Sequence, residues 1–341
     1  MSARRTSPVV RRGATVVVAG LALYVALPAF VRVWATWPRL STLNPWWLVL
    51  VVVSEAASFT CAIALLRLVT RDAGWFASAS ALLAGNAVTN TVPGGDAIGA
   101  GVTFRVLAAA GVRRDQVAGG LAASSVLNFA GLLALPVFAL PALLGGVVNA
   151  DLAHAAELGL VGCALMLGLG AVVLTRDAPL RALGRGVSWA LHALRPRRAR
   201  LDDLASRLLA QRDLVREDLG RNWWKAVLAI AGRVGFDFAS LLAALRATGA
   251  RPHPSLVLIA YAATAIVALV PLTPGGLGIV EASLGGLLVL AGVPSSRAIL
   301  ATLAYRLGSY WLPLVAGAVA YSLFRRRYGA PRASGETVTP S

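Results

Sequence analysis

Five ionisable residues lie inside apolar stretches of this sequence: Glu55, Arg233, Asp237, Glu281 and Arg306. At the centre of a bilayer a charged side chain costs about 2.5–3.5 kcal/mol, so residues of this kind usually serve a function. An arginine in a cavity is a good phosphate ligand, because its guanidinium offers a planar fork of donors. We therefore predict that Arg306 and Glu281 take part in binding a substrate.

The other three residues are predicted to form an intramembrane charge network. Arg233 and Asp237 are four residues apart, so on a helix they share one face and can pair with each other. Glu55 falls near Arg233 when the two halves of the chain are aligned, which favours a pair between the halves instead. The sequence leaves both pairings open.

Two Pro-Gly-Gly triplets interrupt apolar blocks, at residues 93–95 and 274–276. Proline cannot continue a helix and two glycines permit a sharp reversal, so we expect new helices to begin near Ala97 and Gly278. Their N-terminal amides would point into the membrane interior. Because a helix N-terminus attracts phosphate or carboxylate, two such termini would suit an anionic head group.

Polar residues gather around these triplets. Asp96 stands where a helix N-cap is expected, and the other polar groups are open to a second interpretation, in which they only satisfy freed backbone groups. The predicted substrate-binding residues are Asn86, Asn90, Gly94, Gly95, Arg105, Gly275, Gly276, Glu281 and Arg306.

Long apolar blocks carry these residues. The chain is 57% hydrophobic and 14% charged, whereas soluble domains are about half apolar and a quarter charged. Blocks long enough to cross a bilayer occupy residues 13–33, 45–66, 116–140, 158–174, 223–245 and 298–324. Two interrupted blocks occupy residues 75–110 and 254–292. We predict an all-α polytopic membrane protein with two hairpins, which are either re-entrant or cross twice.

The chain has a net charge of +17, and the positions of its basic residues predict the topology. Basic residues lie between the apolar blocks without interleaved aromatics, which favours topology signals and excludes nucleic acid as a partner. All strongly basic segments fall on one side only if each interrupted block is a hairpin. We expect a multi-pass protein of the bacterial cell membrane, with a retained first span and both termini in the cytoplasm.

The two interrupted blocks repeat each other. Residues 92–112 match residues 273–293 at a constant offset of 181, including the Pro-Gly-Gly triplets and Ala-Gly-Val at the end. Within one membrane domain, 1–341, we predict repeat 1 at 44–141, a linking span and cytoplasmic interfacial segment at 142–221, repeat 2 at 222–324 and a cytoplasmic tail at 325–341. The repeats have opposite predicted orientations, an arrangement that is common in transporters.

No motif for hydrolysis, group transfer or ATP binding is visible. Cys61 and Cys163 fall inside predicted spans and have no spacing typical of a disulfide framework or a metal site. We therefore expect no enzymatic activity, no metal and no cofactor.

With these residues identified, the chain resembles the lysylphosphatidylglycerol synthase transmembrane-region family, the flippase-like membrane domain also found in the multiple peptide resistance factor. The resemblance is carried by residues 86–95 (NAVTNTVPGG), 105–111 and 271–281 (PLTPGGLGIVE). It implies a membrane domain that translocates or scrambles a lipid, here without the soluble synthase domain of full-length members. At the position matching Glu281 the first repeat has no glutamate, so the halves differ chemically.

Three functions remain open from the sequence. The first is a flippase or scramblase for an anionic or polyprenyl-phosphate-linked lipid, favoured by a cavity that opens to lipid. The second is a small-solute or ion-coupled transporter, favoured by a sealed cavity. The third is a non-transporting accessory subunit, favoured by a filled interior. Membrane lipids are the expected partners, and a homodimer or a lipid-modifying enzyme partner is left open.

Overall fold

The computed structural model describes residues 43–70, 73–92, 95–144, 204–268 and 273–329, and the single residues 161 and 168. Those residues form helices joined by short connections, and no strand occurs among them, which confirms the predicted all-α class. The predictions for the span at 13–33, the span at 158–174 and the tail beyond residue 329 lie outside the described residues.

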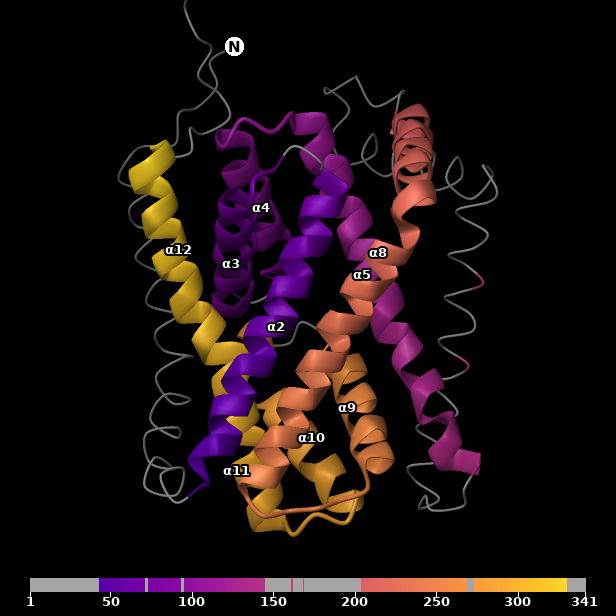
Figure 1. The fold of residues 1–341 in the computed structure, drawn as a ribbon, viewed down its shortest axis with the longest axis vertical. Coiled ribbons are helices and arrows are strands. Elements are labelled where there is room, and N and C mark those ends of the chain that lie inside the picture. The colour runs from indigo at the N-terminus through magenta and orange to yellow at the C-terminus, as the bar shows by residue number, and fades with distance from the viewer. Residues whose placement is uncertain are drawn as a thin grey trace, which may run out of the picture.

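Two long helices run side by side through the centre of the molecule. Helix α2 (Pro45–Thr70) packs along α8 (Leu204–Ala247), and Figure 1 shows them passing each other between the two ends of the structure. Gly232 permits this approach, because a Cβ at that position would overlap the Cys61 Sγ. Since α8 begins at Leu204, the last part of the predicted interfacial segment is helical and continues directly into the predicted span.

Each interrupted block forms a helical hairpin. Helices α3 (Trp75–Thr91) and α4 (Asp96–Ala109) form the first hairpin. Helix α9 (Pro254–Ala268), the 3-10 turn η1 (Pro274–Gly276) and α10 (Ile279–Leu290) form the second. The predicted helix starts near Ala97 and Gly278 are thus confirmed. These four helices have 12 to 17 residues, fewer than the roughly 20 needed to cross a bilayer.

The hairpins lie near opposite ends of the molecule, and each packs against a long helix from the other half of the chain (Figure 1). Helix α5 (Arg114–Leu144) contacts α9. The last helical stretch consists of α11 (Ser295–Arg306), the π-helical turn η2 (Leu307–Trp311) and α12 (Leu312–Tyr328), and its α12 part contacts α3.

The outer surface of these helices is apolar. Pro45–Thr70, Trp223–Ala247 and Ser295–Tyr328 are long and apolar enough to cross a membrane. Their large apolar side chains include Trp46, which is 79% exposed, and Leu228, which is 65% exposed. Because water-soluble proteins rarely expose broad apolar surfaces, this surface fits a lipid environment.

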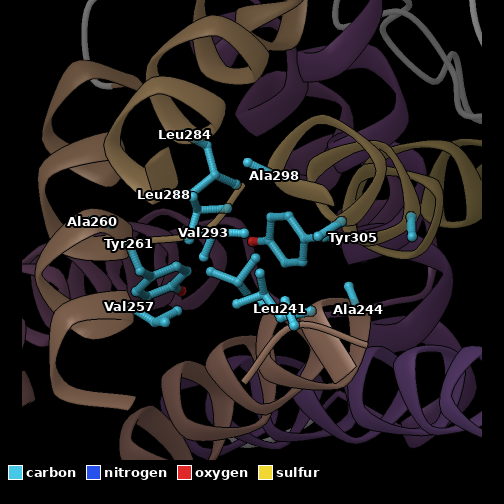
Figure 2. Close-up of a cluster of buried hydrophobic side chains, with 14 of the residues drawn as sticks. Leu241, Ala244, Val257, Ala260, Tyr261, Leu284, Leu288, Val293, Ala298 and Tyr305 are labelled. Carbon is cyan, nitrogen blue, oxygen red and sulfur yellow. The ribbon is translucent and has the colours of Figure 1, made fainter. Parts of the chain in front are cut away.

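The buried apolar side chains form two clusters, one beside each hairpin. The first includes Leu107 and Val112 and lies between α3, α4 and α12. The second includes Leu288 and Val293 and lies between α8, α9, α10 and α11. Figure 2 shows the second cluster. With an apolar core behind each hairpin, the Pro-Gly-Gly segments are held toward the middle of the molecule.

Candidate functional site

A cavity of about 430 Å³ lies between the two Pro-Gly-Gly segments. Both halves of the chain supply polar groups to its wall. The Pro-Gly-Gly segments that precede α4 and α10, which are far apart in sequence, therefore line the same cavity. The lining residues that matter below are Asn90, Gly95 and Asp96 from the first half, and Asp237, Gly275 and Arg306 from the second.

Arg306 is the best-positioned cation of this cavity. Its Nε donates to Glu281 Oε1 at 2.7 Å, and its Nη2 donates to the Gly275 carbonyl at 2.9 Å. The side chains of Arg306 and Glu281 are 11% and 22% exposed. The two residues that were predicted to bind a substrate thus contact each other and the second Pro-Gly-Gly segment. Nη1 has no partner among the described residues, and it remains available to a ligand.

The backbone of the second Pro-Gly-Gly segment explains its glycines. Gly275 has φ +56° and Gly278 has φ +85°, conformations that L-residues with side chains rarely adopt. The Gly278 amide donates to Glu281 Oε2 at 2.5 Å, so this glutamate closes the first turn of α10 as well as holding Arg306. One carboxylate thus fixes both the helix start and the guanidinium.

Tyr310 connects the two Pro-Gly-Gly segments. Its ring lies under the Arg306 guanidinium, 4.6 Å from Cζ to the ring centroid, and its hydroxyl donates to the Asn90 carbonyl at 2.8 Å. Asn90 in turn donates through Nδ2 to Asn86 Oδ1 at 3.1 Å. Tyr310 belongs to the π-helical turn η2, a distortion that is frequent at functional sites.

The first Pro-Gly-Gly segment is built differently. The expectation that Asp96 caps α4 is wrong: Gly95 occupies the N-cap position, Asp96 is the first helical residue, and no side chain caps this end. Both residues line the cavity. Asp96 would be the N-cap only if α4 began at Ala97, and the helix begins one residue earlier. Gly94 lies outside the described residues.

Neither predicted pairing within the charge network forms. The Arg233 guanidinium donates to the Asn128 side chain of α5, so it pairs with neither Asp237 nor Glu55. Asp237 instead accepts hydrogen bonds from the hydroxyls of Tyr261 and Tyr305. The reason is tertiary: α5, α9 and α11 bring neutral partners to both residues, and these partners satisfy the charges more closely.

Glu55 is the most deeply buried member of this network. Glu55 is 2% exposed, and its Oε1 has no hydrogen-bond partner among the described residues. It lies beside Asp237 and Ser240 of α8. The structure thus gathers two carboxylates next to the cavity, rather than three residues of alternating charge.

Arg105 is separated from the other predicted binding residues. Its Nε donates to the carbonyl of Gly101 in its own helix at 3.2 Å. It lines a second cavity, of about 490 Å³, whose other walls come mainly from apolar and small residues of α3, α4 and α12. Arg105 and Arg306 therefore belong to different cavities.

Sequence reasoning missed three tyrosines, Tyr261, Tyr305 and Tyr310, which supply hydroxyls or a ring to the ionisable residues. A buried tyrosine hydroxyl needs a partner, so a tyrosine inside an apolar block that also carries a charge is a usable signal. No group of three or more metal-ligating side chains is found among the residues described. The arrangement can instead bind a phosphate, through a guanidinium and helix N-termini.

A model of the family described as "Lysylphosphatidylglycerol synthase TM region" matches residues 16–317. This match covers most of the chain and includes every residue of the site. The chain belongs to this family. The resemblance noted from the Pro-Gly-Gly segments is confirmed, and membership of a transmembrane-region family agrees with the apolar helices.

One curated relative adds to this assignment. A "UPF0104 membrane protein" of Methanothermobacter thermautotrophicus is 30% identical over 89 residues, which are 26% of this chain and 25% of that protein. The matched segment thus spans about a quarter of the relative's length. No solved structure matches the chain.

Proposed function

We propose that this protein moves a phosphate-bearing lipid between the leaflets of a membrane, as a flippase or scramblase. The head group enters the cavity between the Pro-Gly-Gly segments while the acyl chains remain in apolar surroundings. The lipid is anionic or linked to polyprenyl phosphate. The protein acts on lipid position and carries out no bond chemistry.

The observation that carries this proposal is the geometry around Arg306. The guanidinium is held by Glu281 and the Gly275 carbonyl, and it faces the cavity that receives the start of α4. A fixed guanidinium with a free N–H, opposite a helix N-terminus, suits a phosphate group. Its low exposure strengthens such a contact, because little water competes with the ligand.

The second cavity supports a lipid rather than a small solute. Thr89 and Asn90 line the polar cavity, whereas Val88 and Thr91 line the apolar one. Both cavities therefore adjoin the last turn of α3. A polar space and an apolar space at one helical turn match the two parts of a phospholipid. A filled interior, expected of an accessory subunit, is not what these residues form.

We further propose that the two halves are an inverted repeat with re-entrant hairpins. At the offset of 181 residues, α4 and α10 end alike: the Val112 amide bonds the Leu107 carbonyl at 3.2 Å, and the Val293 amide bonds that of Leu288 at 3.0 Å. The packing of α3 on α12 and of α9 on α5 supports the same relation. Hairpins too short to span agree with re-entry.

Lipid movement is testable in liposomes that contain the purified protein and fluorescent phosphatidylglycerol. Dithionite quenches the outer leaflet only, so quenching beyond about half of the label reports inner-leaflet lipid that has moved outward. We expect the wild-type protein to give this extra quenching, and a Glu281→Ala/Arg306→Ala variant to lose most of it, since removing buried charge contacts costs about 2–5 kcal/mol.

Ser125→Ala is the matched control. Ser125 lies at the position of the first half that aligns with Arg306, and among the described residues its hydroxyl donates only to the Leu121 carbonyl of its own helix. We expect this variant to behave as wild type. Wild-type quenching equal to that of empty liposomes would exclude phosphatidylglycerol, and polyprenyl-phosphate lipid would be tested next. Equal activity in the double variant would reject the site.

A further inference from the structure

The two carboxylates beside the cavity, Glu55 and Asp237, have no counter-charge in contact. Glu55 is 2% exposed, its Oε1 is unpartnered among the described residues, and its neighbour across the helix interface is Asp237. Unpaired buried acceptors are costly, so this arrangement calls for a missing donor.

A proton is the ligand that fits this place. Desolvation of the buried Glu55 carboxylate and repulsion from the neighbouring Asp237 both act against a negative charge on Glu55. One proton bound to a carboxylate oxygen lowers the charge of the pair from −2 to −1 and creates an O–H donor between the two carboxylates. We propose that Glu55 binds a proton next to Asp237 and that the occupancy of this proton site sets the affinity of the cavity for an anionic head group.

The surrounding groups support this assignment. Asp237 accepts from Tyr261 and Tyr305, and Figure 2 shows both tyrosines among the aliphatic side chains of the second cluster, which shield them from solvent. The titratable and charged groups that face the pair are Arg233 from α8, Tyr261 from α9, and Tyr305 and Arg306 from α11. Arg233 is directed to Asn128, and Arg306 to Glu281, so neither guanidinium donates to the pair.

The charge of the carboxylate pair couples proton binding to anion binding in the cavity. Asp237 lines the cavity together with Asp96 and Arg306, so the unprotonated pair adds negative potential where a phosphate would bind. Protonation removes part of that repulsion. By linkage, an anion that binds better to the protonated state also raises the proton affinity of the pair. Proton and anionic head group should therefore bind together, an inference that rests on the proposed function.

The proton itself can be observed without any lipid. Infrared spectroscopy of the purified full chain near pH 8, where exposed carboxylates are ionised, should show the carbonyl stretch of a protonated carboxyl group. Glu55→Gln should remove this band. Asp115→Asn should retain it, because Asp115 is a surface residue with a side chain 71% exposed. A wild-type spectrum without the band overturns the proposal, whether or not the variant folds.

The coupling is tested with dihexanoyl phosphatidylglycerol as an anionic probe in calorimetric titrations near pH 8, where the proton is expected to be bound, and near pH 10.5, where it is expected to be released. Wild-type protein should bind the probe about tenfold more tightly at the lower pH, within the range of ordinary coupling energies. Glu55→Gln should bind it equally at both pH values, and Asp115→Asn should follow wild type. A wild-type affinity that does not change with pH overturns the coupling while the proposed function stands. If the wild type binds no probe at either pH, the proposed function and the coupling fall together, and the infrared band alone then decides the proton site.

Discussion

The two Pro-Gly-Gly segments have nearly the same sequence pattern but different structural roles. Around the second, Glu281, Arg306 and Tyr310 form a charged clamp. Around the first, Ala100 and Ser125 stand at the positions aligned with Glu281 and Arg306, so the clamp has no counterpart. A shared backbone interruption therefore positions two helix starts, while only one half supplies the cation.

The first hairpin is instead held together by glycines. A Cβ at Gly85 would overlap the Thr103 side chain, and a Cβ at Gly99 would overlap Thr89 and the Gly85 carbonyl. The position aligned with Gly99 in the second hairpin is Val280. The first hairpin is thus closely packed through small residues, whereas the second is fixed by polar contacts at its turn. Small residues of this kind permit close helix packing in membranes.

The largest effect is expected from making the first hairpin resemble the second. Gly99→Val should destabilise the protein by about 3 kcal/mol or more, because the valine side chain has no space between α3 and α4. Thermal unfolding in detergent measures the loss. Gly101→Val in the same helix is the control, since nothing lies within 4 Å of a Cβ there. Similar melting temperatures for both variants would show that the hairpin is not held by this contact.

The next effect compares the two arginines. Arg306→Lys should slow lipid movement about tenfold, because one ammonium group cannot contact Glu281, the Gly275 carbonyl and a phosphate with the fixed geometry of a guanidinium. Arg105→Lys should change the rate by no more than about twofold, since Arg105 is outside the polar cavity. Dithionite quenching measures both. If only the Arg105 variant lost lipid movement, the head group would have to bind in the second cavity, which Arg105 lines, and not in the cavity that Arg306 lines.

A smaller effect is expected from the backbone of the second Pro-Gly-Gly segment. Gly278→Ala should cost at least about 1 kcal/mol through its backbone conformation, φ +85° and ψ −42°. A Cβ there meets nothing within 4 Å, so packing adds nothing to this cost. Gly286→Ala, also in open space but inside α10, should be neutral or slightly stabilising. The comparison of melting temperatures separates backbone strain from packing. Equal values would mean that Gly278 does not require its observed conformation.

The smallest effect tests the connection between the two segments. Tyr310→Phe removes the hydroxyl that donates to the Asn90 carbonyl but keeps the ring under Arg306. We expect a loss of about 0.5–1.5 kcal/mol, the usual net contribution of one hydrogen bond. Tyr328→Phe, at a residue 41% exposed, is the control in the same thermal measurement. Binding of the anionic probe should be retained in both variants.

Several features were predictable because they depend on local sequence. The apolar blocks predicted helices, and the Pro-Gly-Gly triplets predicted new helix starts within one residue of those observed at Asp96 and Ile279. Arg306, Glu281 and Gly275 contact one another in the structure, and all three were among the substrate-binding residues predicted from residue type and position. The inverted repeat remains a prediction, although the aligned helix ends agree with it.

Other features depended on packing between distant helices. The charge network was misassigned because Asn128, Tyr261 and Tyr305 reach Arg233 and Asp237 from helices far along the chain. The sequence could not reveal that Arg105 lines a separate cavity, since its distance from α12 is not a local property.

By itself, the sequence determined a helical membrane protein with two interrupted hairpins and a small set of costly intramembrane charges. Periodicity, proline and glycine chemistry and the cost of burying charge act over a few residues, so they can be read directly. Only the tertiary structure decided which charges meet. The packing of α2 along α8 brings Glu55 beside Asp237, and the opposed hairpins place Arg306 in the cavity that Gly95 of the first Pro-Gly-Gly segment also lines. Contacts across such distances depend on how whole helices pack, which no local pattern encodes.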